Sequence, residues 1–487
     1  MTMRLMVLST AKNTDSVLEA LKRVAGDEVE VMLHVGDTTA DFKASTLSRM
    51  NARMGTKGHL MQDTTYRGAA RALEARPDYC ELRDEFEEHM MRTADSYRYK
   101  SHPMQWPHEF HDYYRILCDV IAARLLDEKI THCLFFNVPH LSYDTVLFHV
   151  AESLGIPSII VSQSLFPDLY FSMRHPRDLG GFDPASVQAA PWPIAKGQPP
   201  ELFYMKGVKQ EHEEGGRITP RAVLQLVTFL ATKRPWQAFN PVYIWRLVRR
   251  MHKIYGALPK WRDPFARFFH EDELAYFDHI AGFENQTVDL EGDYVYVALQ
   301  LQPEMTTSAL GGRFHDQALA IERIAALAPP RVRILVKENP KQGAYQRGPL
   351  FFHRLKRIPA VTFLPSWANT HALTERAAAV ATITGTVGWE AICRGKTALI
   401  FGKAWYRKFP GVVEYRDDLT WDEIVAAKPD HTALEAAMGA LAARMHRGVI
   451  DRHYTQLVPD YDVAANDEKV AKTLLGLLKG EVVPTYG

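Results

Sequence analysis

The chain has 487 residues, enough for two or three domains that each bury a core of their own. Its composition is that of a globular protein, with 46% hydrophobic and 24% charged residues, and 58 basic side chains balance 58 acidic ones. This balance argues against a protein dedicated to nucleic acid, which would carry a basic excess.

The cysteines and the apolar segments bear on the cellular compartment. The four cysteines lack the paired spacing of a disulfide framework or a zinc site, so we expect reduced thiols in a cytoplasmic protein. The apolar stretch at the N-terminus is too short and too soon interrupted for a signal peptide. No apolar run approaches the ~20 residues that a membrane-spanning helix requires.

Strand-like and helix-like segments alternate through the first third of the chain. Apolar residues at helical spacing, including Ile116, Val120 and Leu125, predict a helix over residues 108–129. Strand–helix–strand order with short connections predicts a parallel sheet that binds ligands beyond the carboxyl ends of its strands. The predicted strands are 4–9, 28–36, 131–137 and 156–163, and the other predicted helices are 14 onward, 41–92 and 142–155.

The character of the chain changes between about residues 176 and 286, where we expect a helical connector or insertion. A basic aromatic tract, residues 233–262, carries Trp236, Trp245 and Trp261 among arginines and lysines. Aromatic rings beside cations suit a membrane interface that holds a lipid-linked acceptor. The alternative is a connector that packs its tryptophans on the core.

A second alternating unit begins at Tyr294. It is expected to contain strands at 294–300, 331–340, 360–365, 379–384 and 397–402, with helices between them, and a further helix near 467–480 closes the chain. Two such α/β units joined by a connector predict a molecule of two lobes with a cleft between them.

A small-residue turn, Thr384-Gly385-Thr386-Val387-Gly388, lies between a strand and a helix and is followed by Glu390. Such a turn exposes backbone N–H groups at the positive end of a helix, where a phosphate binds. Glu390, one turn further along, could accept hydrogen bonds from ribose hydroxyls. The alternative is an ordinary helix cap, in which Glu390 only stabilises the first turn.

Polar residues also follow two other strands of this unit. Lys337, in the segment Val336–Pro340, could neutralise a phosphate or a sugar carboxylate, unless the strand simply ends in a solvated turn. Gln302 and Glu304 lie before the next helix, where a glutamate could act as base, nucleophile or stabiliser of an oxocarbenium-like centre. Polar residues at a strand exit are equally common in ordinary loops.

Several separated motifs resemble those of bacterial capsule polysaccharide biosynthesis proteins, the family that includes Kdo (ketodeoxyoctonate) transferases. Along the chain they are "FFNVPHLSYDTVLFHVAESLGIPSIIVSQSLFP", "LQPEMTTSALGGRFHDQ", "VKENPKQ" and "TITGTVGWEAICRGKTALIFGKAWYRKFPGV". This is the order expected for that family. The resemblance covers about residues 134–166 and 294–413.

The resemblance implies a GT-B-like α/β fold of two Rossmann-like lobes with an interlobe cleft. It also implies transfer of a sugar from a nucleotide-activated donor, without a cofactor or an essential metal. Glu304 would then stand near the anomeric carbon, and the donor would contact Gln302, Lys337, Asn339, Thr384, Gly385, Thr386, Gly388 and Glu390. The expected segments are 1–175 (acceptor lobe), 176–290 (connector), 291–460 (donor lobe) and 461–487 (C-terminal helix and tail).

One position departs from the family pattern. Many members have His-Pro where this chain has Asn339-Pro340. Asparagine can donate a hydrogen bond to a phosphate but cannot take up a proton or offset charge. The departure bears on a CMP-Kdo donor in particular, more than on nucleotide-sugar binding in general.

For the acceptor, the first lobe offers polar residues after its strands. His140 follows a proline beyond a strand, a suitable place for a general base, although a loop histidine is more often structural. Asp144 is a second catalytic candidate, unless it only caps the next helix. Asn137 and Gln163 are candidates for acceptor binding.

The sequence therefore predicts a cytoplasmic glycosyltransferase, peripheral at the inner membrane if the tract 233–262 contacts lipid. Its substrates would be a nucleotide-sugar donor, such as a CMP-linked ulosonic acid, and a saccharide or lipid-linked acceptor of a capsular or other surface polysaccharide. One rival is a sugar-nucleotide epimerase of the same two-lobed fold, which needs no acceptor. The other is a non-catalytic component of capsule assembly or export.

Overall fold

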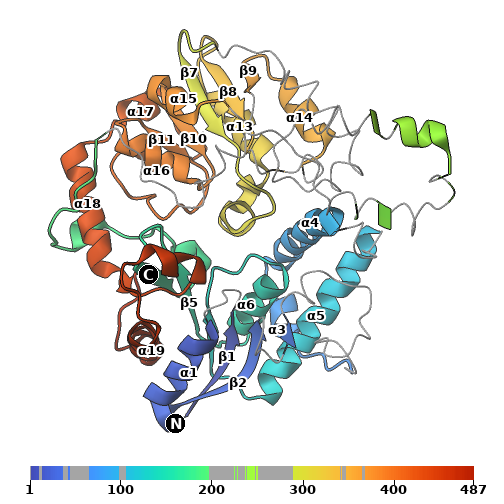
Figure 1. Ribbon diagram of the computed structural model, residues 1–487, viewed down its shortest axis with the longest axis vertical. Coiled ribbons are helices and arrows are strands. Elements are labelled where there is room, and N and C mark those ends of the chain that lie inside the picture. Colours follow the sequence, from blue (N-terminus) through green and yellow to red (C-terminus); the bar gives the residue numbers. More distant parts are fainter. Residues whose placement is uncertain are drawn as a thin grey trace.

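The computed structural model describes residues 2–9, 14–36, 42–43, 65–97, 106–196, 289–339, 342, 347–364 and 368–487, with scattered positions between 224 and 249. These residues form two lobes, each built on a largely parallel sheet with helices on both faces (Figure 1). The expected α/β fold of two Rossmann-like lobes is confirmed. The expected segment boundaries stay predictions, since most of 176–290 lies outside the described residues.

The first lobe contains a sheet in the order β13-β6-β5-β4-β1-β2-β3. Its strands β1 to β5 pair in parallel, whereas β6 and β13 pair antiparallel at one edge. The strands are β1 (Met3–Leu8), β2 (Val29–Gly36), β3 (Phe42–Lys43), β4 (His132–Phe135), β5 (Ser158–Gln163), β6 (Leu169–Met173) and β13 (His446–Arg447).

Alternate residues of β1 point to opposite faces of this sheet. Leu5 and Val7 pack with α1 (Thr14–Ala25) and with α19 (Val463–Lys479), so the last helix of the chain returns to the first lobe. Met6 and Leu8 pack on the other face, which α5 (Pro107–Asp127) and α6 (Tyr143–Ser153) cover.

One prediction for the first lobe is wrong in part, and one strand was not predicted. The predicted helix over 41–92 does not begin at its first residues, because Phe42 and Lys43 form β3; its described later part is helical in α3 (Arg71–Glu74) and α4 (Tyr79–Tyr97), and residues 44–64 lie outside the described residues. The sequence also did not indicate β6 as a strand. Its residues are buried throughout and pair with β5, so tertiary pairing defines this strand more than its own pattern does.

The second lobe contains a sheet in the order β12-β11-β10-β7-β8-β9, with every pair parallel. Its strands are β7 (Tyr294–Ala298), β8 (Arg333–Lys337), β9 (Val361–Leu364), β10 (Ala379–Thr382), β11 (Ala398–Ile400) and β12 (Val412–Glu414). Its helices are α13 (Gln317–Leu327), α14 (Pro349–Lys356), α15 (Thr370–Arg376), α16 (Thr386–Cys393), α17 (Trp421–Ala426) and α18 (His431–Arg444).

Aromatic side chains join the two lobes on one side. Trp405, which follows β11, stacks on Phe171 of β6 with ring centroids 6.2 Å apart, and Tyr486 packs on the same Phe171 at 5.2 Å. The Tyr486 hydroxyl also donates to the Trp405 carbonyl (3.3 Å). The C-terminal segment thus contacts both lobes. No described helix is both long and apolar enough to cross a membrane.

Candidate functional site

The strand order of the second sheet reverses between β7 and β10. The chain continues from β7 to β8 on one side, whereas β10 and β11 lie on the other side. Loops that leave two such strands diverge, and the space between them is where open α/β sheets bind ligands. Gln300, just past β7, accepts hydrogen bonds from the Thr384 amide (2.8 Å) and the Thr382 hydroxyl (3.2 Å). Its side chain therefore ties the two loops together.

The first amides of α16 face this point. Gly385 is the N-cap residue and has no side chain with which to cap the helix. In the described part of the chain, no acceptor lies within hydrogen-bonding distance of the Thr386 and Val387 amides. Gly385 and Thr386 are half-buried, so the start of the helix is not sealed inside the core. An anion could bind there, favoured by the helix dipole.

The turn is held in place by its own lobe. The Thr384 hydroxyl donates to the Thr306 carbonyl (2.7 Å), and the Tyr406 hydroxyl donates to the Gly385 carbonyl. A Cβ at Gly388 would lie 2.2 Å from the Tyr406 hydroxyl oxygen, a clash that glycine avoids because it has no Cβ. Among the predicted donor contacts, Thr384 and Gly388 therefore shape the turn, and Gly385 and Thr386 present the open amide end.

Lys337 and Glu390, the latter on α16, lie close enough for their charges to interact. Lys337, at the end of β8, is only 8% exposed, and burial lowers its pKa to about 8 against the opposing attraction of Glu338 and Glu390. Burial likewise raises the pKa of Glu390 to about 7, opposed by Arg394 and Lys337. Among the described residues, neither side chain has a hydrogen-bond or ion-pair partner. A buried ammonium without a bonded anion is suited to a phosphate.

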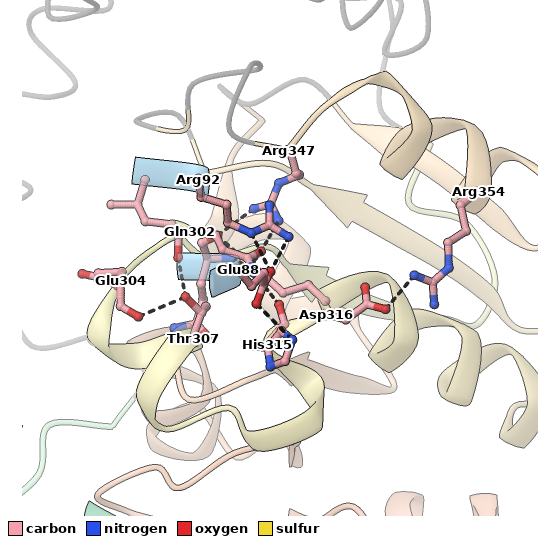
Figure 2. A network of polar contacts seen from close by, with 12 residues as sticks. Glu88, Arg92, Gln302, Glu304, Thr307, His315, Asp316, Arg347 and Arg354 are labelled. Atoms are coloured by element: carbon pink, nitrogen blue, oxygen red, sulfur yellow. Dashed lines mark hydrogen bonds and ion pairs between the residues drawn. The ribbon is translucent and has the colours of Figure 1, made fainter. Parts of the chain in front are cut away.

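Gln302 is buried and belongs to a network of polar contacts (Figure 2). Its amide nitrogen donates to the His315 carbonyl (2.6 Å), and its amide oxygen accepts from Arg347 and Gln317, each at 3.3 Å. Arg347 forms a buried ion pair with Glu338 (2.6 Å) and also donates to the Gln300 carbonyl (2.7 Å). This arrangement favours a positioning role for Gln302 over the predicted direct contact with the donor.

Glu304 and Asn339 lie on the loops that leave β7 and β8. The Glu304 carboxylate accepts a hydrogen bond from the Thr306 hydroxyl at the start of η5 (Met305–Ala309), next to the turn before α16. The backbone N–H of Asn339 donates a hydrogen bond to the Glu338 carboxylate (2.8 Å). The structure thus brings Glu304, Lys337, Asn339 and the start of α16 to the carboxyl edge of one sheet.

His140 of the first lobe has a defined tautomer. Its Nδ1 lies 2.7 Å from the Val138 carbonyl, which can only accept, so Nδ1 carries the proton and Nε2 is the basic nitrogen in the neutral ring. The ring is half-buried. This geometry suits a general base but does not by itself place the ring beside a substrate.

The other candidate residues of the first lobe form hydrogen bonds within the protein itself. Asp144 is 1% exposed and accepts from the His140 and Leu141 amides (3.0 and 2.6 Å), so it caps the turn before α6, and burial raises its pKa. The Gln163 side chain donates to Pro167 and Leu169 carbonyls and accepts from the Ile450 amide. Asn137 accepts from the Val138 amide and the Ser162 hydroxyl. These contacts favour structural roles for Asp144 and Gln163.

Sequence reasoning missed the polar face of α4. Glu85, Glu88, His89 and Arg92 recur at the i, i+3, i+4, i+7 spacing of one helix face, which is the signal that could have revealed them. Glu88 forms an ion pair with His315 of the second lobe (3.0 Å). His89 is 8% exposed, and burial lowers its pKa to about 3, with His140 and Arg92 adding to the shift.

Comparison with known proteins supports the resemblance noted in the sequence. Residues 274–446 match the family model described as capsule polysaccharide biosynthesis protein. No curated protein matches the chain.

Solved structures with a similar arrangement have low sequence identity. The chain is similar to a β-Kdo 2,7-transferase, KpsC of Thermosulfurimonas dismutans, at 11% identity and a TM-score of 0.30, over 74% of this chain and 89% of that one. It is similar to UDP-GlcNAc 2-epimerase of Methanocaldococcus jannaschii at 11% identity and 0.26, over 97% and 99% of the chains. Anabaena HepE with UDP-glucose matches at 10% identity and 0.28, over 97% and 100%. At these values the likenesses carry no functional argument, and the fold assignment rests on the two sheets.

Proposed function

We propose that this protein is a glycosyltransferase that moves a sugar from a nucleotide-activated donor to a capsular or other surface polysaccharide. The proposal is carried by one observation: the open amide end of α16 lies at the switch point of the second sheet, where the charges of the unpaired Lys337 and Glu390 also interact. The match of residues 274–446 to the capsule family supports the same conclusion.

On the donor side, the Thr386 and Val387 amides would hydrogen-bond the phosphate of the nucleotide. The Lys337 ammonium would neutralise its charge from the end of β8, and Glu390 would accept hydrogen bonds from the ribose hydroxyls. Because these donors are fixed before the substrate binds, they stabilise the charge that the departing nucleotide gains in the transition state. A CMP-linked ulosonic acid such as CMP-Kdo is the donor we propose to test first.

In the transfer step, the bond from the anomeric carbon to the phosphate oxygen breaks and the nucleotide leaves with the bonding electrons. The acceptor hydroxyl forms the new glycosidic bond and gives its proton to a base, for which His140 Nε2 is the candidate. Glu304, on the loop beside the turn, would stabilise the positive charge that develops at the anomeric centre. In this mechanism no step uses a metal, a prediction that activity in the presence of a chelator would test.

A thermal-shift screen against CMP, CDP, UDP, GDP and TDP tests the donor site. A nucleotide that binds only the folded protein raises its melting temperature by mass action. Lys337→Met should reduce affinity roughly 10- to 100-fold, since it removes a charge-assisted hydrogen bond. Lys356→Met, on an exposed lysine of α14 in the same lobe, is the matched control and should leave the shift unchanged. If no nucleotide shifts the wild type, the proposed function is wrong.

Incubation with donor alone separates transfer from the rival epimerase activity. A transferase should release nucleotide slowly until an acceptor is added, whereas an epimerase would convert the sugar nucleotide without one. Nucleotide binding without either reaction would favour the non-catalytic component of capsule assembly.

A further inference from the structure

We propose that Glu88 of the first lobe is a positioning residue for the donor site of the second lobe. It would act by holding the loop from Gln300 to Asp316, which carries Glu304. This inference rests on the proposed function for its catalytic consequence, although the contact itself can be tested without any substrate.

Glu88 makes the contact between α4 and this loop (Figure 2). Its Oε2 lies 3.0 Å from His315 Nε2, and its Oε1 accepts from both Arg92 Nε (2.6 Å) and, at 3.5 Å, the Gln302 side chain. The opposite ring nitrogen of His315 faces the Gly312 carbonyl at 2.8 Å. Both ring nitrogens thus face oxygen atoms, one from each lobe, so the ring bridges α4 and the loop.

The contact continues without a break to the turn before α16. Gln302 receives a hydrogen bond from Arg347, and Arg347 donates to the Gln300 carbonyl. Gln300 in turn accepts from the Thr384 amide. A helix of the acceptor lobe is therefore linked through four side chains to the segment that would bind the nucleotide.

Glu88 is partly buried, which makes the contact more than a surface ion pair. The side chains of Glu88 and His315 are 27% and 25% exposed, whereas Arg313 of the same loop and its partner Asp417, which follows β12, are 54% and 68% exposed. Exposed pairs contribute little to stability, and partly desolvated charge networks contribute more. Glu304 must be held to within a fraction of an ångström to act at the anomeric centre, so loosening this loop should lower the rate.

The first test is hydrogen–deuterium exchange of the ligand-free protein. Glu88→Ala and His315→Ala, which cut the same contact from opposite lobes, should both speed exchange in peptides covering residues 300–316. Arg313→Gln, which breaks only the pair inside the second lobe, is the matched control and should leave exchange there unchanged. Unchanged exchange in either alanine variant overturns the proposal.

The second test is steady-state transfer with CMP-Kdo as the probe donor. Glu88→Ala should lower kcat about tenfold while CMP affinity changes less than threefold, because the nucleotide turn is also held by Tyr406 and Thr382. The double variant Glu88→Ala/His315→Ala should be no slower than either single variant. Additive losses, or an equal loss of CMP affinity, would show a merely structural role. If the wild-type protein neither turns over CMP-Kdo nor releases nucleotide from UDP-N-acetylglucosamine, the proposed function is contradicted. Hydrogen–deuterium exchange would in that case still show whether Glu88 holds the loop.

Discussion

Lys337 and Glu390 show how burial can adjust two opposite charges at one site. Each group lacks a bonded partner among the described residues, and burial shifts each pKa toward the neutral form. The two groups are therefore poised near neutral pH, where a bound nucleotide would favour the charged form of Lys337. The sequence indicated both residues separately, from their places at a strand end and in a helix. It did not reveal that their charges interact, because that depends on how α16 packs on β10 and β11, beside β7 and β8.

Nucleotide affinity should therefore pass through a maximum between about pH 7 and pH 8. Glu390, with a pKa of about 7, gains its carboxylate as pH rises through 7, and Lys337, with a pKa of about 8, loses its ammonium as pH rises through 8. Both charged forms are needed, so affinity falls on either side, by up to about tenfold per pH unit. Calorimetric titration with CMP at a series of pH values above 6.5 would measure this.

Single substitutions assign each side of that pH profile to one group. Glu390→Gln should remove the fall in nucleotide affinity on the acid side of the profile and keep the fall on the alkaline side. Lys337→Met should remove the fall on the alkaline side and keep the fall on the acid side. A profile that keeps both sides in the two variants would show that other groups control binding.

At the scale of elements, α16 is positioned by the side chain of another loop. Tyr406 is fully buried, donates to the Gly385 carbonyl, and fills the space that a Cβ at Gly388 would need. The composition of the glycine-rich turn alone predicts an anion site, and this stays a prediction. The function of its individual residues could not be predicted, because Thr384 and Gly388 have partners that come from distant loops.

Gly388→Ala should destabilise the second lobe by about 2 kcal/mol, since a new methyl group must displace a side chain that has no room to move. Tyr406→Phe should cost about 1 kcal/mol through the lost hydrogen bond. Because Phe removes the oxygen 2.2 Å from the new Cβ, the double variant should lose less than the sum of the two. Melting temperatures of the four proteins would measure this. Strictly additive losses would contradict the proposed steric cause.

Glutamines at strand exits illustrate the same limit of sequence reasoning. Gln163 ends β5 and Gln302 follows β7, positions that binding residues often occupy, yet their amides bond to the protein's own backbone and side chains. The contact of Glu88 with Gln302 joins residues 214 positions apart. Periodicity within one helix predicts a polar face, but the partner of that face is set by how two lobes pack.

At the scale of the whole molecule, the two lobes follow from the alternation of strands and helices that the sequence shows. The return of α19 to the first lobe was not predicted, since it depends on the packing of this helix against α1. The basic aromatic tract is the part that this alternation does not explain. Its described residues include Trp236 and Trp245, which are 86% and 60% exposed, and Arg249 lies over the Trp245 ring at 5.3 Å. Exposure of these two rings favours an interface over packing on the core, and Trp261 lies outside the described residues.

We therefore expect the purified protein to float with vesicles that contain anionic phosphatidylglycerol, and to float less with phosphatidylcholine alone. Indole rings partition to the headgroup region, and the neighbouring arginines are attracted to anionic lipid, so binding should weaken as salt is raised.

The double variant Trp236→Ser/Trp245→Ser should abolish flotation. Trp106→Ser is the matched control, because Trp106 is equally exposed, at 60%, but lies at the start of α5 in the first lobe. Equal loss in that control would mean that exposed tryptophans bind lipid without specificity, and no flotation of the wild type would exclude lipid as the partner of this tract. Flotation that depends on the tract would support the proposal that the acceptor is a lipid-linked saccharide.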